Sequence, residues 1–410
     1  MGDRDIIRDL AEKVSEIASL PEQKEKSEMW FRHNRLERVK PMVLIFPEGS
    51  WRELITEKDL LTTERLCRDL EYDLRQRLYY QEHLQDDNVI DGTVVSPIVI
   101  NTTGWGVSEN TTNPEDPCGA RHYNPVIQTE SDIEKLRKPQ ITIDWKATEQ
   151  RYQRLCDLIG GILPVQKRGI THCWFAIVDQ FAQLRGLDQI FLDMVDRPEW
   201  LHRALNFITE CMLEQLDFYE KENVLSLNNG AHYCGSGGVG FTDQLPQQDS
   251  DRVHVRAIDM WGFATTQIFS EVSPAMHEEF ALQYEKRWLR RFGLNAYGCC
   301  EPLHKKLHLV KTIPRIRRIS MSPWVDVEEG ARQLGDKYIF SWKPNPAVLA
   351  AEKWDPDFVR RIISEMLNKT RGCIVEIIMK DTHTCRNQPE RMWEWVKIAK
   401  EEVSIFQKFQ

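Results

Sequence analysis

Short apolar runs that alternate with helix-like segments constrain this 410-residue chain more than any other feature. Each run ends at turn-forming or polar residues, as residues 42–46 do before Pro47-Glu48-Gly49. A segment with the helical spacing of apolar residues then follows. About eight such units succeed one another without a long antiparallel run. This order predicts an α/β fold of the (β/α)8 TIM-barrel type rather than an open doubly wound sheet.

Two parts of the chain are expected to differ in organisation. Residues 1–80 predict an N-terminal helical extension with a short strand, and residues 81–410 predict the barrel.

A glycine-rich loop at 235–240 leads to Thr242-Asp243 rather than straight into a helix, which argues against a dinucleotide-binding fingerprint.

Charge and cysteine content limit the partners and the compartment. The net charge of −9 argues against nucleic acid, because phosphate binding needs a basic surface. No apolar run reaches membrane-spanning length, and the first residues lack an apolar signal region, so we expect no membrane partner. Ten cysteines without regular spacing predict reduced thiols in a cytoplasmic protein.

Barrel enzymes place their catalytic groups at the carboxyl ends of the strands, so the residues that follow the predicted strands are the candidates. Thirteen tryptophans is a high count, and several lie near these strand ends. The strand-end residues are Glu48, Asn101, Trp105, Asp179, Asn228, Asn229, Asp259, Trp261, Cys299, Cys300, Glu301, Ser322, Trp324, Lys343, Lys380, Asp381 and His383.

The segment Cys299-Cys300-Glu301 is the most informative of these positions. Thiolate, carboxylate and imidazole are zinc ligands, and a catalytic zinc keeps three protein ligands and one open position. Adjacent strand residues point to opposite faces, so one cysteine is expected to face inward and the other to pack. His383, which follows the predicted strand at 373–379, would complete the site. The alternative is a buried cysteine pair beside a solvated glutamate.

The other candidates predict substrate binding and proton transfer. A tryptophan-lined pocket suits a flat ligand, although core packing is the commoner role of any single tryptophan. The expected binding residues are Trp51, Trp105, Trp261, Trp324, Asn228, Asn229 and Asp259. Lys343, Lys380 and Asp381 are the expected catalytic groups, and Lys380-Asp381 could form an ion pair, orient a metal-bound group or bind a substrate anion.

One block carries a resemblance to a known family. Ser273-Pro274-Ala275-Met276-His277-Glu278-Glu279-Phe280 opens a helix, with Ser273-Pro274 as its predicted cap, and leads to a strand bearing Cys300-Glu301. This order resembles the cobalamin-dependent methyltransferase branch of the uroporphyrinogen decarboxylase superfamily over residues 80–405. In that branch the strand carries His-x-Cys zinc ligands. Here Gly298-Cys299-Cys300 stands at that position, so the histidine is missing.

The resemblance implies Zn²⁺ held by Cys300, Glu301 and His383. Cys299, Cys385 or the His232/Cys234 pair are the alternative ligands. It further implies methyl transfer from a methoxylated aromatic or similar small donor to the corrinoid (cobalamin) cobalt of a separate corrinoid-binding protein, and it is compatible with a homodimer. The missing histidine moves the expected substrate away from coenzyme-M-type thiols. The alternatives are a metal-free decarboxylase or lyase of the same fold, and a non-catalytic binding protein.

Overall fold

The computed structural model describes residues 2–115 and 119–408, and its main element is a curved sheet of seven parallel strands. In spatial order these are β1 (Met42–Ile45), β13 (Ile374–Met379), β12 (Ile339–Trp342), β11 (Ile316–Met321), β10 (Leu294–Tyr297), β9 (Trp261–Ala264) and β8 (Trp174–Phe175). Three two-stranded pairs complete the strands: parallel β2 (Val94–Pro97) with β7 (Val165–Arg168), and antiparallel β3 (Ile100–Thr102) with β6 (Ile141–Ile143) and β4 (Asn110–Thr112) with β5 (His122–Asn124).

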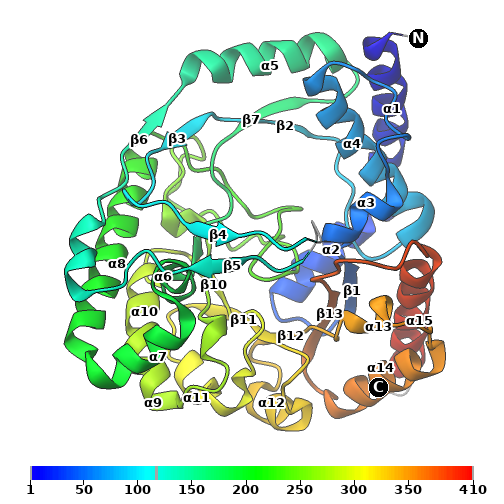
Figure 1. The fold of residues 1–410 in the computed structure, drawn as a ribbon. Coiled ribbons are helices and arrows are strands. Elements are labelled where there is room, and N and C mark those ends of the chain that lie inside the picture. The colour runs from blue at the N-terminus through cyan, green and yellow to red at the C-terminus, as the bar shows by residue number, and fades with distance from the viewer. Residues whose placement is uncertain (1, 116–118, 409–410) are drawn as a thin grey trace.

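Helices surround the strands as an outer layer (Figure 1). They are α1 (Asp3–Ala18), α2 (Pro21–Asn34), α3 (Trp51–Leu54), α4 (Arg65–Tyr79), α5 (Trp145–Ile159), α6 (Ile177–Arg185), α7 (Leu187–Asp196), α8 (Pro198–Lys221), α9 (Pro274–His277), α10 (Gln283–Leu289), α11 (Leu307–Val310), α12 (Val327–Leu334), α13 (Ala347–Ala350), α14 (Pro356–Lys369) and α15 (Glu390–Gln407). The predicted Ser273 cap of α9 is confirmed, because its hydroxyl oxygen accepts from the Met276 N–H at 3.2 Å.

The strand order is that of a barrel that does not close. First strand β1 pairs in parallel with last strand β13, which is the neighbour relation of a TIM barrel. In the described residues β2 and β7 pair with each other instead of completing the ring between β1 and β8. The α/β prediction with parallel strands is therefore confirmed, whereas a closed ring of eight hydrogen-bonded strands is not found in the described ranges.

Two carboxylates replace a neighbouring strand at the free edge of β1. Asp86 accepts from the Ile45 N–H at 3.0 Å, and Asp87 accepts from the Val43 N–H at 2.8 Å. Buried backbone N–H groups need an acceptor, and an unpaired edge otherwise invites another strand. Burial raises the pKa of Asp86 to about 7, which shows how strongly this edge is enclosed.

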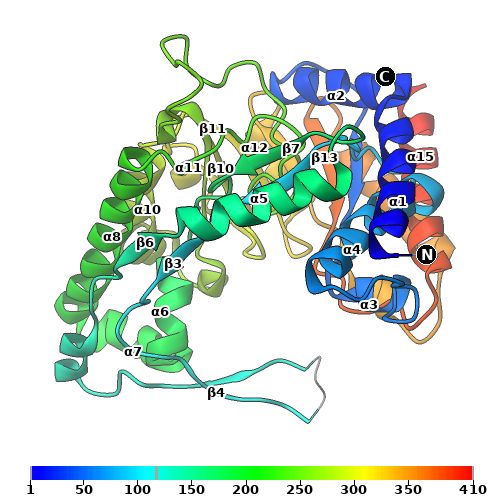
Figure 2. The same cartoon turned by 90° about the horizontal axis from the view of Figure 1, so that it is seen from above.

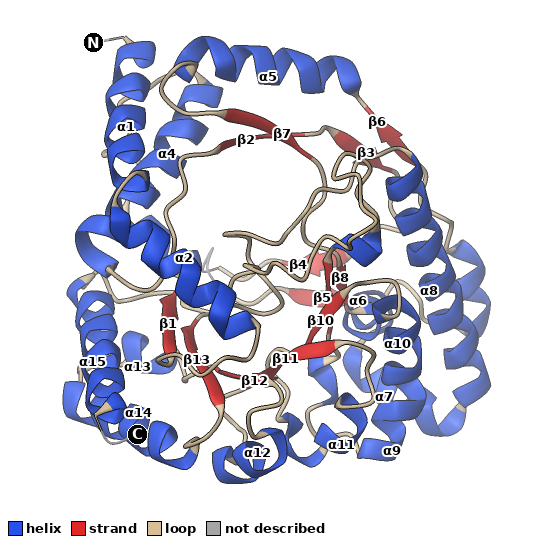
Figure 3. Ribbon diagram, turned by 180° about the vertical axis from the view of Figure 1, so that it is seen from behind, coloured by secondary structure: helices blue, strands red, loops and turns tan. Residues whose placement is uncertain are grey.

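The interior of the curved sheet holds a buried ion pair and the glycine-rich loop. Arg318 Nε lies 2.8 Å from Glu376 Oε1, an ion-pair contact rather than a well-directed hydrogen bond. From α2, which crosses the sheet in Figure 3, His33 contacts Glu376 at 3.2 Å and Asn34 accepts from Arg318 at 2.8 Å. Burial alone would raise the pKa of Glu376, but Arg318 and then His33 hold it at about 2.

Glycine is required where that loop packs into the interior. Gly237 has φ +124°, and a Cβ there would lie 2.6 Å from Ile378 Cγ2. We expect Gly237→Ala to lower the free energy of unfolding by about 1–3 kcal/mol through overpacking, on top of backbone strain. Gly335→Ala is the matched control, because Gly335 has φ +51° but no atom within 4 Å of its would-be Cβ. Equal losses in urea unfolding would contradict the packing explanation.

The segment between β3 and β6 forms an arm rather than a loop without structure. Strands β4 and β5 pair at Asn110/Asn124, Thr111/Tyr123 and Thr112/His122, and Figure 2 shows this arm leaving the body of the molecule.

Within the described residues, no helix has both the length and the apolar character needed to cross a bilayer.

Candidate functional site

The cysteine pair lies in a turn beyond β10. The strand ends at Tyr297, earlier than predicted, so the alternation of strand side chains no longer applies at Cys299 and Cys300. Their sulfur atoms lie 3.6 Å apart. The turn is fixed because the Cys299 N–H donates to Glu301 at 2.9 Å and its carbonyl accepts from Ser320 at 2.9 Å. Strand alternation therefore gives no reason to expect one inward and one packing cysteine, and that split stays a prediction.

Lys380, which follows β13, joins the two predicted clusters into one site. Its Nζ lies 3.6 Å from Cys299 Sγ and 3.1 Å from Asp381 Oδ1. Contact with the Cys300 thiol, and then the Lys380 charge, lowers the pKa of Cys299. Burial disfavours the Lys380 ammonium, but Tyr233, Cys299 and Asp381 outweigh it and raise its pKa. Lys380 is therefore held as an ammonium beside the Cys299 thiol.

The loops after β1 and β13 are held together at this point. Ser50 N donates to the Thr382 carbonyl at 3.0 Å, and Thr382 Oγ1 donates to the Phe46 carbonyl at 2.8 Å. Glu48 and Asp381 both have positive φ, at 46° and 58°, which non-glycine residues rarely adopt. Burial and then Asp381 raise the pKa of Glu48, so its carboxyl lies close to this cluster. Strained residues of this kind gather at functional sites.

An aromatic group that the sequence did not reveal adjoins the cluster. The Tyr233 ring packs edge-on against Phe46 at 5.1 Å and against His172 at 5.8 Å between centroids. His172 in turn stacks on Phe263 at 4.8 Å. Tyr233 remains 36% exposed, yet burial raises its pKa and Lys380 is the nearest charge. We name Phe46, Glu48, His172, Tyr233, Cys299, Cys300, Lys380 and Asp381 the strand-end cluster.

Glu301 turns away from the two sulfur atoms. One carboxylate oxygen accepts from Thr265 Oγ1 at 2.8 Å, and the other accepts from the Cys299 N–H. Its side chain is fully buried. Neighbouring Asp179 accepts from the Gln267 and Ile268 N–H groups at 3.2 Å, and burial raises its pKa to about 7. Glu301 therefore supports the turn that carries the cysteines.

A chain of buried hydrogen bonds lies behind β10. Lys306 Nζ donates to His277 Nδ1 at 3.1 Å, and His277 Nε2 contacts Tyr297 Oη at 2.7 Å. Tyr297 then donates to Glu285 at 2.7 Å, and Thr266 donates to the second oxygen at 2.8 Å. Burial raises the pKa of Glu285 to about 8 and lowers that of Lys306 to about 8. This chain anchors the last residue of β10, two residues before Cys299.

Glu285 should make stability depend on pH. Its folded pKa of about 8 lies above the usual 4.5, so the unfolded chain releases this proton first. The stabilising contribution is complete below pH 4.5 and is lost as the pH rises through about 8. We expect Glu285→Gln to flatten the fall in thermal midpoint across this range. In the variant, Asp179, whose pKa burial raises to about 7, still makes the thermal midpoint fall with rising pH.

Glu365→Gln, at an exposed position of α14, serves as the control and should keep the wild-type slope. A Glu285→Gln slope as steep as the wild type would contradict the assignment.

The predicted zinc ligands do not converge as a set of three in this structure. Among the described residues, no three His, Cys, Asp or Glu side chains are positioned to hold a metal ion. His383 lies beside Gly49, and its carbonyl accepts from Arg52 at 3.0 Å. Cys385 is buried and its thiol donates to Glu53 at 3.1 Å. The ligand set Cys300, Glu301 and His383 therefore stays a prediction.

Four predicted binding residues, Asn228, Asn229, Asp259 and Trp261, make structural contacts. Strand β9 begins at Trp261, where the sequence suggested an end, because the preceding residues form a turn that the Asp259 N–H closes by donating to the Arg256 carbonyl at 2.9 Å. The Asp259 carboxylate also accepts from the Gln247 N–H at 2.9 Å. Trp261 is fully buried, and Asn228 bonds to its backbone N–H and carbonyl. Asn229 donates to the Leu245 carbonyl at 2.8 Å. These contacts leave Trp261 without a face for a ligand.

The remaining predicted residues lie in different surroundings. Trp51 packs on Tyr79 and Tyr80, Trp105 is half-buried, and Trp324 is 66% exposed after β11. Lys343 is buried after β12 and donates to Ser341, and burial lowers its pKa to about 7. The alternative zinc ligands His232 and Cys234 have different partners. His232 contacts Arg168 at 3.0 Å, whereas Cys234 is buried near Arg318.

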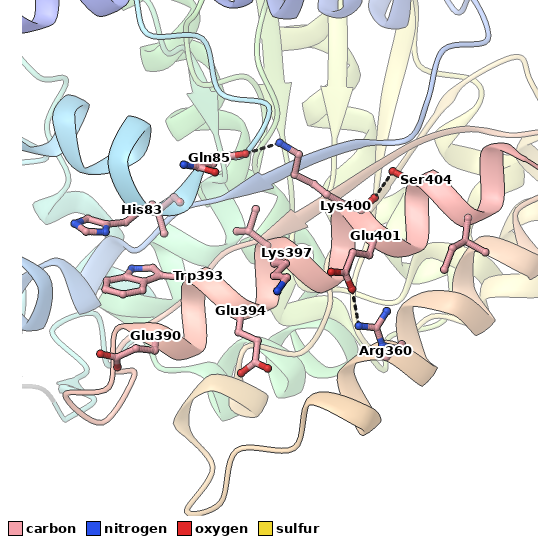
Figure 4. A pocket seen from close by; sticks show the side chains of 13 residues that line it. His83, Gln85, Arg360, Glu390, Trp393, Glu394, Lys397, Lys400, Glu401 and Ser404 are labelled. Carbon is pink, nitrogen blue, oxygen red and sulfur yellow. Dashed lines mark hydrogen bonds and ion pairs between the residues drawn. The ribbon is translucent and has the colours of Figure 1, made fainter.

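A large cavity lies elsewhere, on the outside of the fold. It measures about 860 Å³ and lies between α14, α15 and the π-helical turn Tyr80–Leu84. Trp393 stacks on His83 at 4.5 Å, and Arg360 pairs with Glu401 at 2.6 Å across it (Figure 4). Charged side chains of both signs line it, among them Glu390, Glu394, Lys397, Lys400 and Glu401 of α15 in the outer layer of helices. None of the sequence-predicted site residues lines this cavity.

Comparison with known proteins shows a likeness to solved structures. No protein-family model and no curated protein matches the chain. A solved methyltransferase from Methanosarcina mazei is similar, at 12% sequence identity and a TM-score of 0.46, over 92% of this chain and 97% of that one. A likeness at this level does not assign an activity, which has to be argued from the site.

Proposed function

We propose that this chain is a methyltransferase that moves a methyl group from a small donor, first among them a methoxylated aromatic, to the cobalt of a corrinoid carried by a separate protein. The observation that carries the proposal is the pair of contacting thiols beside Lys380 at the carboxyl ends of β10 and β13. Soft ligands beside an ammonium suit the cleavage of an inert ether bond.

The sulfur pair fits one part of a zinc site. Two sulfur atoms on a tetrahedral zinc ion stand about 3.8 Å apart, given a Zn–S bond of about 2.3 Å. The sulfur atoms of Cys299 and Cys300 are 3.6 Å apart. We therefore propose both cysteines as sulfur ligands, with His383 as the third protein ligand, because both carboxylate oxygens of Glu301 already accept hydrogen bonds. When bound, zinc would polarise the ether oxygen, and the reduced corrinoid would accept the methyl group.

The chain's own residues have separate tasks in this reaction. The Lys380 ammonium, held in place by Asp381 at 3.1 Å, stabilises the negative charge that develops on the departing oxygen. The exposed faces of Tyr233 and His172 hold a flat ring by stacking. Glu301 keeps the cysteine turn in place through the Cys299 N–H.

Metal analysis of protein purified without oxygen tests this assignment. We expect close to one zinc per chain, and loss of that zinc in the Cys299→Ala/Cys300→Ala variant. The runner-up is a metal-free decarboxylase or lyase of the same fold, favoured by the lack of three converging ligands among the described residues. That function predicts a zinc-free protein whose activity survives a chelator.

A further inference from the structure

The two cysteines of the strand-end cluster differ from the other described cysteines in one respect. They are consecutive, and their sulfur atoms are in contact at 3.6 Å. The remaining described cysteines are also free thiols, several of them inside the core, such as Cys173, Cys211 and Cys234. The pair lies in a turn, so its side chains are not held apart by strand geometry.

The geometry favours oxidation at this pair. The two sulfur atoms are already in contact at 3.6 Å, so little movement separates the dithiol from a disulfide. Cys300 is half-buried, so a small oxidant can reach the pair. A resolving thiol in contact is the arrangement that turns a first oxidation into a disulfide.

The bond that would form is a strained one. Consecutive Cα atoms stand about 3.8 Å apart, below the usual range of about 4.4–6.8 Å for disulfides. Strained disulfides are easily reduced and act as labile or regulatory bonds rather than as staples. The sulfur atoms have to close from 3.6 Å to about 2.0 Å for the bond to form.

We propose that Cys299 and Cys300 form a reversible vicinal disulfide, with a peroxide as oxidant and a dithiol as reductant. The two thiols lose two electrons and two protons, the peroxide O–O bond breaks, and hydrogen peroxide leaves as two water molecules. A dithiol restores both thiols by exchange and becomes a disulfide itself. Only the consequence for activity, loss of methyl transfer in the oxidised form, rests on the proposed function.

The test uses the full-length protein, both as purified and after treatment with a chelator that frees metal-bound thiols. Each sample receives hydrogen peroxide and is then digested for mass spectrometry. We expect the peptide containing Cys299 and Cys300 to become two hydrogen atoms lighter, and dithiothreitol to restore its mass. Cys373→Ser, which removes a half-buried thiol at the amino end of β13, should leave this change intact.

The outcomes separate the two proposals. In Cys300→Ser the remaining Cys299 should gain oxygen instead, because it lacks the resolving thiol. Gain of oxygen by the wild-type pair, or an unchanged pair in the chelated protein, would overturn the disulfide. Formation of the disulfide in a protein without methyl-transfer activity would keep this inference and reject the proposed function.

Discussion

Replacing Cys299 by alanine is expected to reduce methyl transfer about a thousandfold or more. The variant removes a sulfur ligand and the group beside Lys380, whose Nζ lies 3.6 Å away. Lewis-acid stabilisation of a departing oxygen is worth several kcal/mol, and each 1.4 kcal/mol is about tenfold in rate. The measurement is the rate at which cob(I)alamin is methylated by a methoxylated aromatic donor.

Cys373→Ala is the matched control for that experiment. Cys373 is half-buried like Cys300, but it precedes β13 and therefore lies at the end of the strand opposite Lys380. We expect this variant to keep its rate. Thermal midpoints of both variants separate lost chemistry from lost folding. A Cys299→Ala rate within a few-fold of the wild type would show that the thiol pair is not the reactive centre.

Replacing Glu376 by glutamine is expected to lower the free energy of unfolding by about 3–5 kcal/mol, since removing one partner leaves a buried charge unpaired. Arg318 is 2% exposed at its side chain, and its contacts are Glu376, Asn34 and the Val239 carbonyl. The measurement is urea unfolding followed by circular dichroism. Arg318→Met/Glu376→Leu removes both charges and should recover part of the loss.

The control for this prediction is a solvent-exposed ion pair on the protein surface. Glu329 and Arg332 are paired at 2.6 Å on α12 with side-chain exposures of 35% and 71%. Glu329→Gln should cost at most about 1 kcal/mol. A Glu376→Gln loss as small as that of Glu329→Gln would show that water reaches the centre of the sheet and that the pair does not organise it.

The sequence predicted those elements whose signals are local. Apolar runs that end at polar residues located β1, β10, β12 and β13, and Ser273 marked the start of α9. The predicted strand ends were less accurate where a hydrogen bond to a residue elsewhere in the chain determines them. The run at 257–261 is apolar enough for a strand, yet its first half is a turn whose Asp259 carboxylate accepts from Gln247 N.

The candidate site, too, was predicted only where its residues follow a strand and not where they meet through tertiary contacts. Joining the segments at 299–301 and 380–381 followed from the rule that parallel strands share a carboxyl edge, and Lys380 does meet Cys299. The Tyr233 contacts with Phe46 and His172 link residues far apart in the chain, so no local pattern indicated them. Side-chain bonds to the backbone of β9 likewise depend on tertiary contacts, which is why Asn228 resembled a ligand-binding residue.

One measurement tests the proposed activity most directly. Purified protein is incubated without oxygen with cob(I)alamin and a panel of small donors that carry a labelled methyl group, with the Cys299→Ala/Cys300→Ala variant beside it. The account predicts labelled methylcobalamin from at least one methoxylated aromatic donor with the wild type, and none with the variant. Equal product from both proteins, or release of carbon dioxide without any methylcobalamin, would contradict it.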